Sequence, residues 1–251
     1  MFYSLQVDFR RLFLSRRYYY SIAGMALALL LNGITYMGTV AGTVSLGECF
    51  DEVSFGGFMI LFYLLCVVGG GLDYCMDVKN HFMRYTVVRS GLSSYTLSKT
   101  IVSAAAGWIS SFLGQAFFLG LMWFVLRFIN GGTGEEMPPS GLVPEMWWGL
   151  LTFSLLGSVL SVLGLFVTCF VPNVFVGITA PVLCYYMVIT LTDKYFTNPY
   201  FLPGCIYFAR YYSLFGSGVK HFGYALLVTL CMVLLMYAGI YSLMKRRGEH
   251  V

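Results

Sequence analysis

Six long apolar runs constrain this chain of 251 residues more than any other feature. A helix needs about 20 mostly apolar residues to cross the hydrocarbon core of a bilayer. Only 10% of the residues are charged, against about 25% in soluble domains, so a soluble core does not explain the runs. We predict an all-α polytopic membrane protein with a single transmembrane domain over residues 1–251. The predicted spans are Tyr18–Val40, Phe55–Leu72, Thr100–Phe128, Gly149–Val171, Val174–Leu191 and Phe222–Met244.

The segment before the first span predicts an N-terminal amphipathic elbow helix over residues 1–17. Phe2, Leu5, Phe9 and Leu12 recur at helical spacing, and four arginines supply charge. This pattern is typical of a helix that lies in the membrane interface. A solvated tail that only carries inside-directing charge is the alternative. The segment does not read as a cleaved secretory signal, because the apolar run after it exceeds the usual length.

The positions of the charged residues predict the topology. Connections on the cytoplasmic side of a membrane carry an excess of Lys and Arg, whereas residues 41–54 and 129–148 contain six acidic residues, Glu48, Asp51, Glu52, Glu135, Glu136 and Glu145. We therefore expect both termini and residues 73–99 in the cytoplasm. The expected cytoplasmic segments hold 11 of the 15 basic residues: Arg10, Arg11, Arg16, Arg17, Lys79, Arg84, Arg89, Lys99, Lys245, Arg246 and Arg247. Because these cations flank the spans, the net charge of +4 does not indicate a nucleic-acid partner.

Several residues within the runs predict how the helices pack. Ser103, Gly107 and Ser111 follow one another at intervals of four, a spacing that lets membrane helices approach closely. The amides of Asn32 and Gln115 are expected to form hydrogen bonds between helices.

Two features of the C-terminal half predict local geometry. The short Pro172-Asn173 connection requires the fourth and fifth spans to be antiparallel neighbours. Pro181 is predicted to kink or break the fifth span. Residues 192–221 are aromatic and rich in Pro and Gly, which favours short re-entrant or external helices between spans five and six.

The sequence lacks the motifs of a membrane enzyme. It has no HExxH, no GxSxG and no pair of carboxylates inside a run, so no catalytic residue and no metal ligand is predicted. Ser98-Lys99-Thr100 lacks the glycine that a phosphate-binding loop places before its lysine. The absence of acidic residues in mid-span disfavours ion-driven transport. The seven cysteines show no CxxC spacing, and a disulfide between the external Cys49 and Cys205 is left open.

The connection after the second span carries a pattern that resembles a known family. Asp77, Arg84-Tyr85, Arg89, Tyr95 and Ser98-Lys99 precede the third span. This order resembles the cytoplasmic loop of ABC-2-type transporter permease subunits, especially those of Gram-positive bacterial exporters. The resemblance covers the layout of the whole chain: an elbow helix, six spans, the basic connection and an aromatic segment before the last span.

The resemblance implies a function, partners and site residues. It implies a permease subunit in a bacterial cell membrane that exports a hydrophobic or amphipathic substrate such as a peptide, drug or lipid. ATP and Mg²⁺ would bind to separate ABC ATPase subunits, with no cofactor on this chain, and a second permease subunit would complete a homodimer or heterodimer. Pro181 would lie at a gate. The residues expected to couple the chain to the ATPase are Asp77, Phe82, Arg84, Tyr85, Arg89 and Lys99.

Two alternatives to this interpretation remain open. The cations between residues 73 and 99 could set topology without contacting a partner. The chain could also be a non-transporting immunity or sensory protein that binds a peptide at its external loops.

Overall fold

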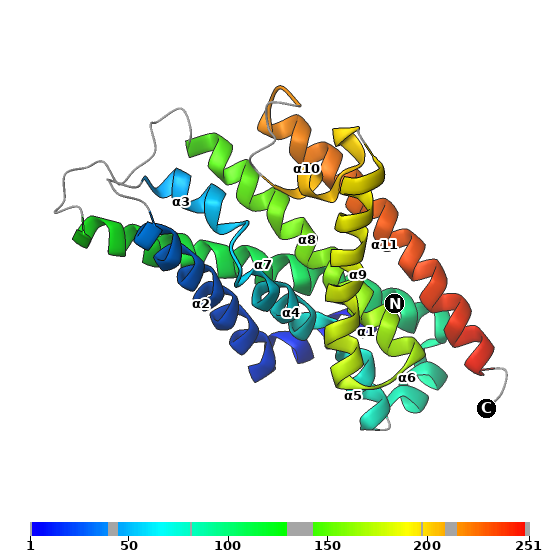
Figure 1. Ribbon diagram of the computed structural model, residues 1–251. Helices are drawn as coiled ribbons and strands as arrows, with labels where there is room; N and C mark the ends of the chain where they lie inside the picture. The colour runs from blue at the N-terminus through cyan, green and yellow to red at the C-terminus, as the bar shows by residue number, and fades with distance from the viewer. Residues whose placement is uncertain are drawn as a thin grey trace.

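The computed structural model of the chain describes residues 2–39, 45–80, 82–129, 143–196, 198–208 and 215–248. Within these ranges every regular element is a helix (Figure 1). The elements are α1 (Phe2–Phe13), α2 (Arg16–Thr39), α3 (Leu46–Val53), α4 (Met59–Gly70), α5 (Asp73–Lys79), α6 (Phe82–Ser90), α7 (Leu92–Ile129), α8 (Val143–Phe170), α9 (Val174–Tyr195), the 3-10 helix η1 (Pro199–Phe201), α10 (Pro203–Tyr207) and α11 (Gly218–Gly248).

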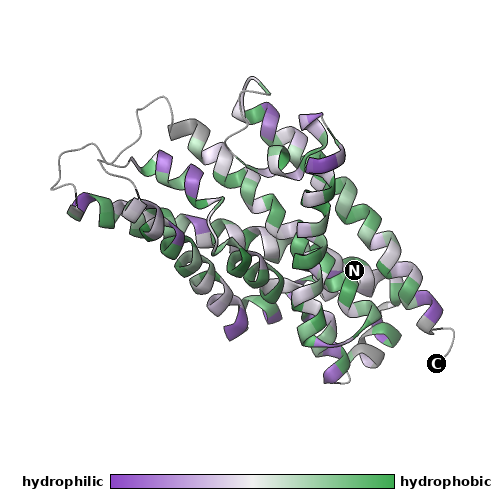
Figure 2. Cartoon of the chain, in the orientation of Figure 1, coloured by the Kyte–Doolittle hydropathy of each residue, from purple (hydrophilic) through white to green (hydrophobic). Residues whose placement is uncertain are grey.

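The predicted class, an all-α polytopic membrane protein, is confirmed. By length and composition, α2, α7, α8, α9 and α11 could each cross a membrane. The pair α4 and α5 forms a sixth candidate if its two helices are taken together. Figure 2 shows apolar residues along these helices and polar residues concentrated near their ends.

The second predicted span, Phe55–Leu72, contains only the short helix α4, which begins at Met59. α4 ends at Gly70, and α5 follows at an angle of 50°. Three consecutive glycines, Gly69 to Gly71, precede the bend, and glycine weakens a helix because it has no side chain to restrict the backbone. A Cβ atom on Gly71 would lie 2.7 Å from the carbonyl oxygen of Ser161. The glycines therefore allow α8 to pack directly against the bend.

The connection over residues 73–99 is helical almost throughout. It contains α5, α6 and the first two turns of α7, which begins at Leu92 rather than at the predicted Thr100. In the preceding connection, α3 begins with a capping box in which Ser45 and Glu48 each bond the other's backbone N–H. Such a box satisfies backbone donors that the first turn leaves free.

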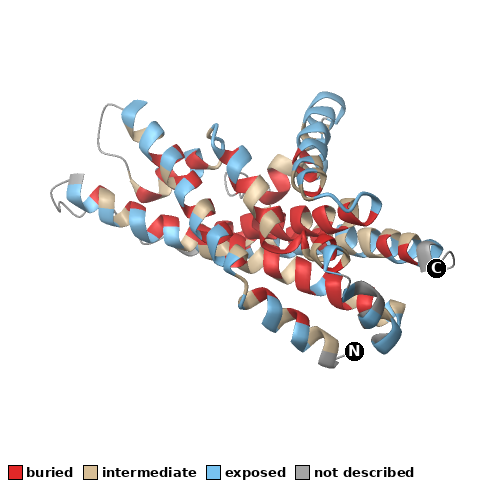
Figure 3. Ribbon diagram, turned by 90° about the horizontal axis from the view of Figure 1, so that it is seen from below, coloured by how far each residue is buried: buried red, intermediate tan, exposed pale blue. Residues whose placement is uncertain are grey.

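α7 and α8 pack closely at the centre of the bundle, and α8 is the most buried of the crossing helices. Figure 3 shows the buried residues gathered in the central helices. A Cβ atom on Gly107 would clash with the carbonyl oxygen of Gly157, and the Ser103 and Ser161 hydroxyls are 3.0 Å apart. The predicted role of the small residues in helix packing is confirmed.

The two buried amides behave differently. The Asn32 side chain donates to the carbonyl oxygen of Val53 at 3.3 Å and accepts from the backbone N–H of Phe58 at 3.0 Å. It therefore ties α2 to the segment around α3 and the start of α4, as predicted. Gln115 instead donates to the carbonyl and hydroxyl oxygens of Ser111 in its own helix. Its described bonds lie within α7 and not between helices.

The fifth span is not broken at its proline. α9 continues from Val174 to Tyr195 with Pro181 buried inside it. The short Pro172-Asn173 connection does join neighbouring helices, α8 and α9, and Asn173 caps α9 by accepting from the N–H of Phe175 at 2.9 Å. The role of Pro181 at a gate stays a prediction.

The two segments predicted to be external contain Cys49 and Cys205 as free thiols. Both are buried, Cys49 in α3 and Cys205 in α10. Burial raises the pKa of the Cys49 thiol to about 12. Burial, with a smaller contribution from Asp193, also raises the pKa of Cys205. The disulfide that the sequence left open is not formed.

Candidate functional site

A cluster of charged side chains lies where α1, the start of α2, α5 and the start of α7 meet. We call it the charge cluster and define it by Asp8, Arg11, Arg17, Asp73, Asp77, Tyr95, Ser98 and Lys99. Helical spacing places these groups together: Asp73 and Asp77 are four residues apart on α5, and Tyr95 and Lys99 are four apart on α7. Each pair therefore projects from one face of its helix.

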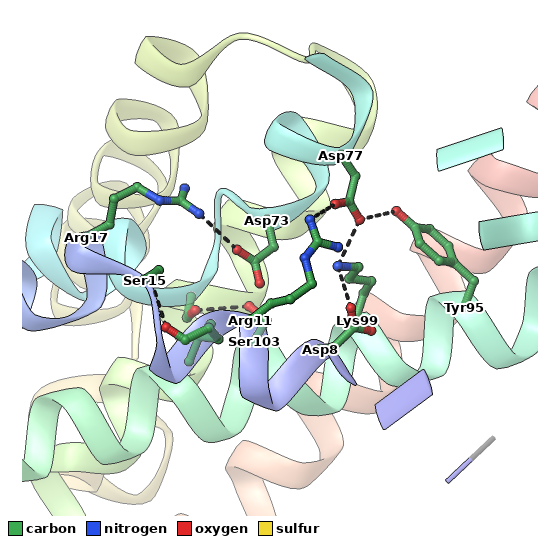
Figure 4. Close-up of polar contacts among 11 residues, drawn as sticks. Asp8, Arg11, Ser15, Arg17, Asp73, Asp77, Tyr95, Lys99 and Ser103 are labelled. Atoms are coloured by element: carbon green, nitrogen blue, oxygen red, sulfur yellow. Dashed lines mark hydrogen bonds and ion pairs between the residues drawn. The ribbon is translucent and has the colours of Figure 1, made fainter. Parts of the chain in front are cut away.

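Lys99 is the centre of the charge cluster (Figure 4). Its Nζ lies 2.8 Å from Oδ2 of Asp77 and 3.0 Å from Oδ1 of Asp8. The Lys99 side chain is 4% exposed, and those of Asp77 and Asp8 are 3% and 8% exposed. One buried ammonium group thus joins α7 to both α1 and α5.

Neutral donors complete the bonding of the two buried carboxylates. The Tyr95 hydroxyl donates to Oδ2 of Asp77 at 3.1 Å, and the Ser98 hydroxyl donates to Oδ2 of Asp8 at 2.8 Å. Hydrogen bonds of this kind stabilise a carboxylate that burial would otherwise make costly. Tyr95 and Ser98 therefore support the charged state of the cluster.

Two arginines close the cluster on its more exposed side. Arg11 Nη2 lies 3.3 Å from Oδ1 of Asp77, and Arg17 Nη2 lies 3.5 Å from Oδ1 of Asp73. The Arg11 guanidinium also lies over the ring of Phe82, 5.3 Å from its centroid. These contacts extend the cluster from α5 to α2 and α6.

The charges of the cluster balance. Three carboxylates face three cations, so the group carries no net formal charge. A buried ion pair is costly to desolvate, and removal of one partner leaves an uncompensated charge that typically costs about 3–5 kcal/mol.

A polar cavity of about 140 Å³ lies beside the ion pairs. It is lined by Asp8, Arg11, Leu12, Arg17, Asp73, Met76, Asp77, Asn80 and Lys99.

The arrangement favours a mechanical role. Asp8 and Asp77 are each held by a cation and a hydroxyl, so neither is placed to act as a free base or nucleophile. The contacts join α1, α5 and the start of α7. The cluster would transmit a displacement of α5 to α7 and to α1.

The residues predicted to couple the chain to an ATPase do not form one surface. Asp77 and Lys99 are buried in the charge cluster, and Tyr95 of the family-like pattern lies there too. Phe82, Tyr85 and Arg89 are exposed on α6.

The other predicted site residues lie apart from both groups or have no described side chain. Arg84 belongs to α6, but its side chain lies outside the described residues. Pro181 belongs to α9, which contributes no residue to the charge cluster.

Sequence reasoning missed Asp8, Arg11, Arg17 and Asp73 as members of a site. A signal was present, because Asp8, Asp73 and Asp77 are acidic residues within segments that otherwise carry many arginines and lysines. The i, i+4 spacing of Asp73 and Asp77 also indicated a common face. Neither signal was enough to predict which cation pairs with each carboxylate.

Comparisons with protein-family profiles, curated proteins and solved structures gave no match.

Proposed function

We propose that this chain is the transmembrane permease subunit of an ATP-driven exporter, with α6 as the element that contacts a separate ATPase. In this proposal the charge cluster and α6 face the cytoplasm, as do both termini. The observation that carries the proposal is an exposed apolar stripe on α6, directly beside the buried charge cluster.

The stripe consists of Phe82, Tyr85 and Val88, which follow one another at intervals of three. They are 49%, 77% and 88% exposed, and Arg89 beside them is also exposed. Aromatic residues and arginine are enriched at protein interfaces, where a few such anchors supply most of the binding energy. A short helix with this surface suits docking to another protein.

The position of α6 suits the transmission of force. In the sequence α6 lies between α5 and α7. The ion pair between Asp77 of α5 and Lys99 of α7 joins the two helices that flank it. α7 in turn packs along α8 through Gly107 and Gly157. Movement of the ATPase against α6 would thus pass through the ion pair into the centre of the bundle.

The proposal assigns no catalysis to this chain. ATP and Mg²⁺ would bind to the ABC ATPase subunits, and their hydrolysis would drive the motion of α6. A second permease subunit, identical or homologous, would complete the transport path. The resemblance noted in the sequence supports a hydrophobic or amphipathic substrate, such as a peptide, drug or lipid-like molecule, that leaves the cell.

Co-purification with an ABC ATPase encoded beside this chain tests the proposal. The wild-type complex should hydrolyse ATP, and the double variant Tyr85→Asp/Arg89→Glu should lose most of the bound ATPase. Lys79→Glu is the matched control, since Lys79 is exposed in the neighbouring α5 but lies off the stripe. It should retain the ATPase.

Two results would count against the proposal. Equal retention of the ATPase by the wild type and the double variant would remove α6 from the interface. Lack of any association between the wild-type chain and an ATPase would favour the alternative of a non-transporting immunity or sensory protein.

A further inference from the structure

We propose that the corner between α1 and α2 binds the headgroups of acidic phospholipids through Arg10 and Arg16. The inference depends on the membrane location of the chain and not on its proposed role as an exporter. It concerns the face of α1 opposite to the one that the sequence predicted to face lipid.

The apolar face of α1 is used for packing within the protein. Leu12 is buried, and Phe9 and Phe13 pack in the same hydrophobic cluster, against Val102 of α7 and Ile22 of α2. Asp8 fixes the same face of α1 to Lys99. The face that would insert into lipid in a free amphipathic helix is therefore covered by protein.

The opposite face of α1 mixes arginine with exposed apolar residues. Val7 is 38% exposed, Arg10 is exposed, and Leu14 at the turn is 72% exposed. Arg16 opens α2, and Tyr19 and Tyr20, three and four residues later, are 59% and 70% exposed. Residues at these spacings share one side of the helix.

This combination matches the headgroup layer of a membrane. Tyrosine is enriched at that level because its ring is apolar and its hydroxyl is polar. A leucine as exposed as Leu14 is unfavourable in water and is stabilised when it enters the acyl boundary. Arg10 and Arg16, on either side of Leu14 in the sequence, would contact the phosphate groups of the lipids.

The pairing of the nearby carboxylates makes the corner cationic. Among the described residues at this end of the bundle, Asp8, Asp73 and Asp77 are all paired with cations in the charge cluster. In the same part of the chain, Arg10 and Arg16 form no ion pair with a carboxylate. These two exposed arginines are therefore available to pair with an anion outside the described chain, and an anionic bilayer surface supplies one.

Thermal unfolding of the full chain in detergent, with added lipid, tests the inference. Phosphatidylglycerol should raise the Tm of the wild type more than phosphatidylcholine does, because a ligand of the folded state stabilises it. Arg10→Gln/Arg16→Gln should unfold at the wild-type Tm without lipid and bind phosphatidylglycerol about 30-fold more weakly, at roughly fivefold for each lost cation. Lipid adducts counted by native mass spectrometry give a second readout.

Two further variants complete the test. Arg127→Gln, at the opposite end of α7, should keep the preference for phosphatidylglycerol. Arg10→Lys/Arg16→Lys should restore most of the preference, since both charges are retained.

Three outcomes would overturn the inference. One is an unchanged preference for phosphatidylglycerol in Arg10→Gln/Arg16→Gln, and another is an equal stabilisation of the wild type by inorganic phosphate alone. The third is loss of ATPase binding by that variant with its lipid preference intact, which would assign the corner to a protein partner.

Discussion

Lys99 bonds two carboxylates from different helices while almost completely buried. An ammonium group on a flexible chain suits this position, because it can direct its three protons toward partners at different angles. The Tyr95 and Ser98 hydroxyls, on the same helix, stabilise the same two carboxylates. Three nearby residues of α7 therefore determine how α1 and α5 are held.

Replacement of Lys99 should destabilise the fold. We expect Lys99→Met to lower the free energy of unfolding by about 3–5 kcal/mol, since Asp8 would be left buried without a cation and Asp77 would keep only the partly exposed Arg11. Equilibrium unfolding in mixed micelles measures the change. Lys79→Met, at an exposed position, should change the free energy by less than about 0.5 kcal/mol.

A triple variant separates charge pairing from packing. Adding Asp8→Asn and Asp77→Asn to Lys99→Met removes the uncompensated charges, so much of the lost stability should return. A Lys99→Met variant as stable as Lys79→Met would contradict the buried pairing.

The cysteines provide a prediction for α3 and α10. Cys49 and Cys205 are buried free thiols, and the pKa of about 12 at Cys49 leaves roughly one thiol in ten thousand ionised at pH 8. The folded protein in detergent should therefore react with N-ethylmaleimide mainly at the exposed Cys184 and Cys231.

Intact mass after denaturation completes this test. Unfolding without a reductant should allow all seven cysteines to react. A limit of five adducts that rises to seven after reduction, and stays at the same count in Cys49→Ala/Cys205→Ala, where five cysteines remain, would show that Cys49 and Cys205 are paired.

The interface between α7 and α8 depends on glycine at their closest approach. A Cβ atom on Gly107 would lie 2.6 Å from Cβ of Ser161, besides its clash with the Gly157 carbonyl. No flexible side-chain end is available to move aside, so the helices would have to separate. Membrane helices associate largely by such close packing and by hydrogen bonds.

Gly107→Val should therefore cost more than a typical substitution, about 3 kcal/mol or more in unfolding free energy. The matched control is Gly120→Ala, in the same helix, where an added Cβ atom would meet no other atom within 4 Å. It should be neutral or stabilise the helix by about 0.5–1 kcal/mol, because alanine restricts the unfolded backbone more than glycine. Similar unfolding curves for the two variants would show that α7 and α8 are farther apart than described.

α5 and α6 illustrate how one short connection can serve two purposes. α5 turns its carboxylates inward to Lys99, Arg11 and Arg17, whereas α6 presents Tyr85 and Val88 outward. The cation-π contact of Arg11 with Phe82 joins the two groups. A load applied to α6 would thus reach the interior through a defined contact.

The orientation of the whole bundle can be tested directly. In a background without native cysteines, we expect a membrane-impermeant maleimide to label Gly57→Cys in intact cells and to spare Val88→Cys. Gly57 is exposed in the turn before α4, and Val88 is exposed on α6, so both thiols would be accessible from their own side. Labelling of Val88→Cys alone would reverse the proposed topology and separate α6 from any cytoplasmic ATPase.

Much of the molecule follows from local patterns along the chain. The apolar runs determine which segments are helices that can enter a bilayer, because a backbone in lipid must satisfy its own hydrogen bonds. The spacing of Ser103, Gly107 and Ser111 predicted a packing face, and the polarity of Asn32 predicted a hydrogen bond between helices. The apolar runs and the small-residue spacing lie within single helices, so the pattern along the chain is enough to detect them. Asn32 is detected by its polarity inside an apolar run.

The charge cluster depends on which helices lie side by side. Asp8 and Lys99 are 91 residues apart, and no periodicity connects them. The bend after the three glycines and the packing of α1 on α7 bring these side chains together and divide the basic connection into a buried part and an exposed part. Coulomb attraction can select a partner only once folding has placed the charges within a few ångströms of each other.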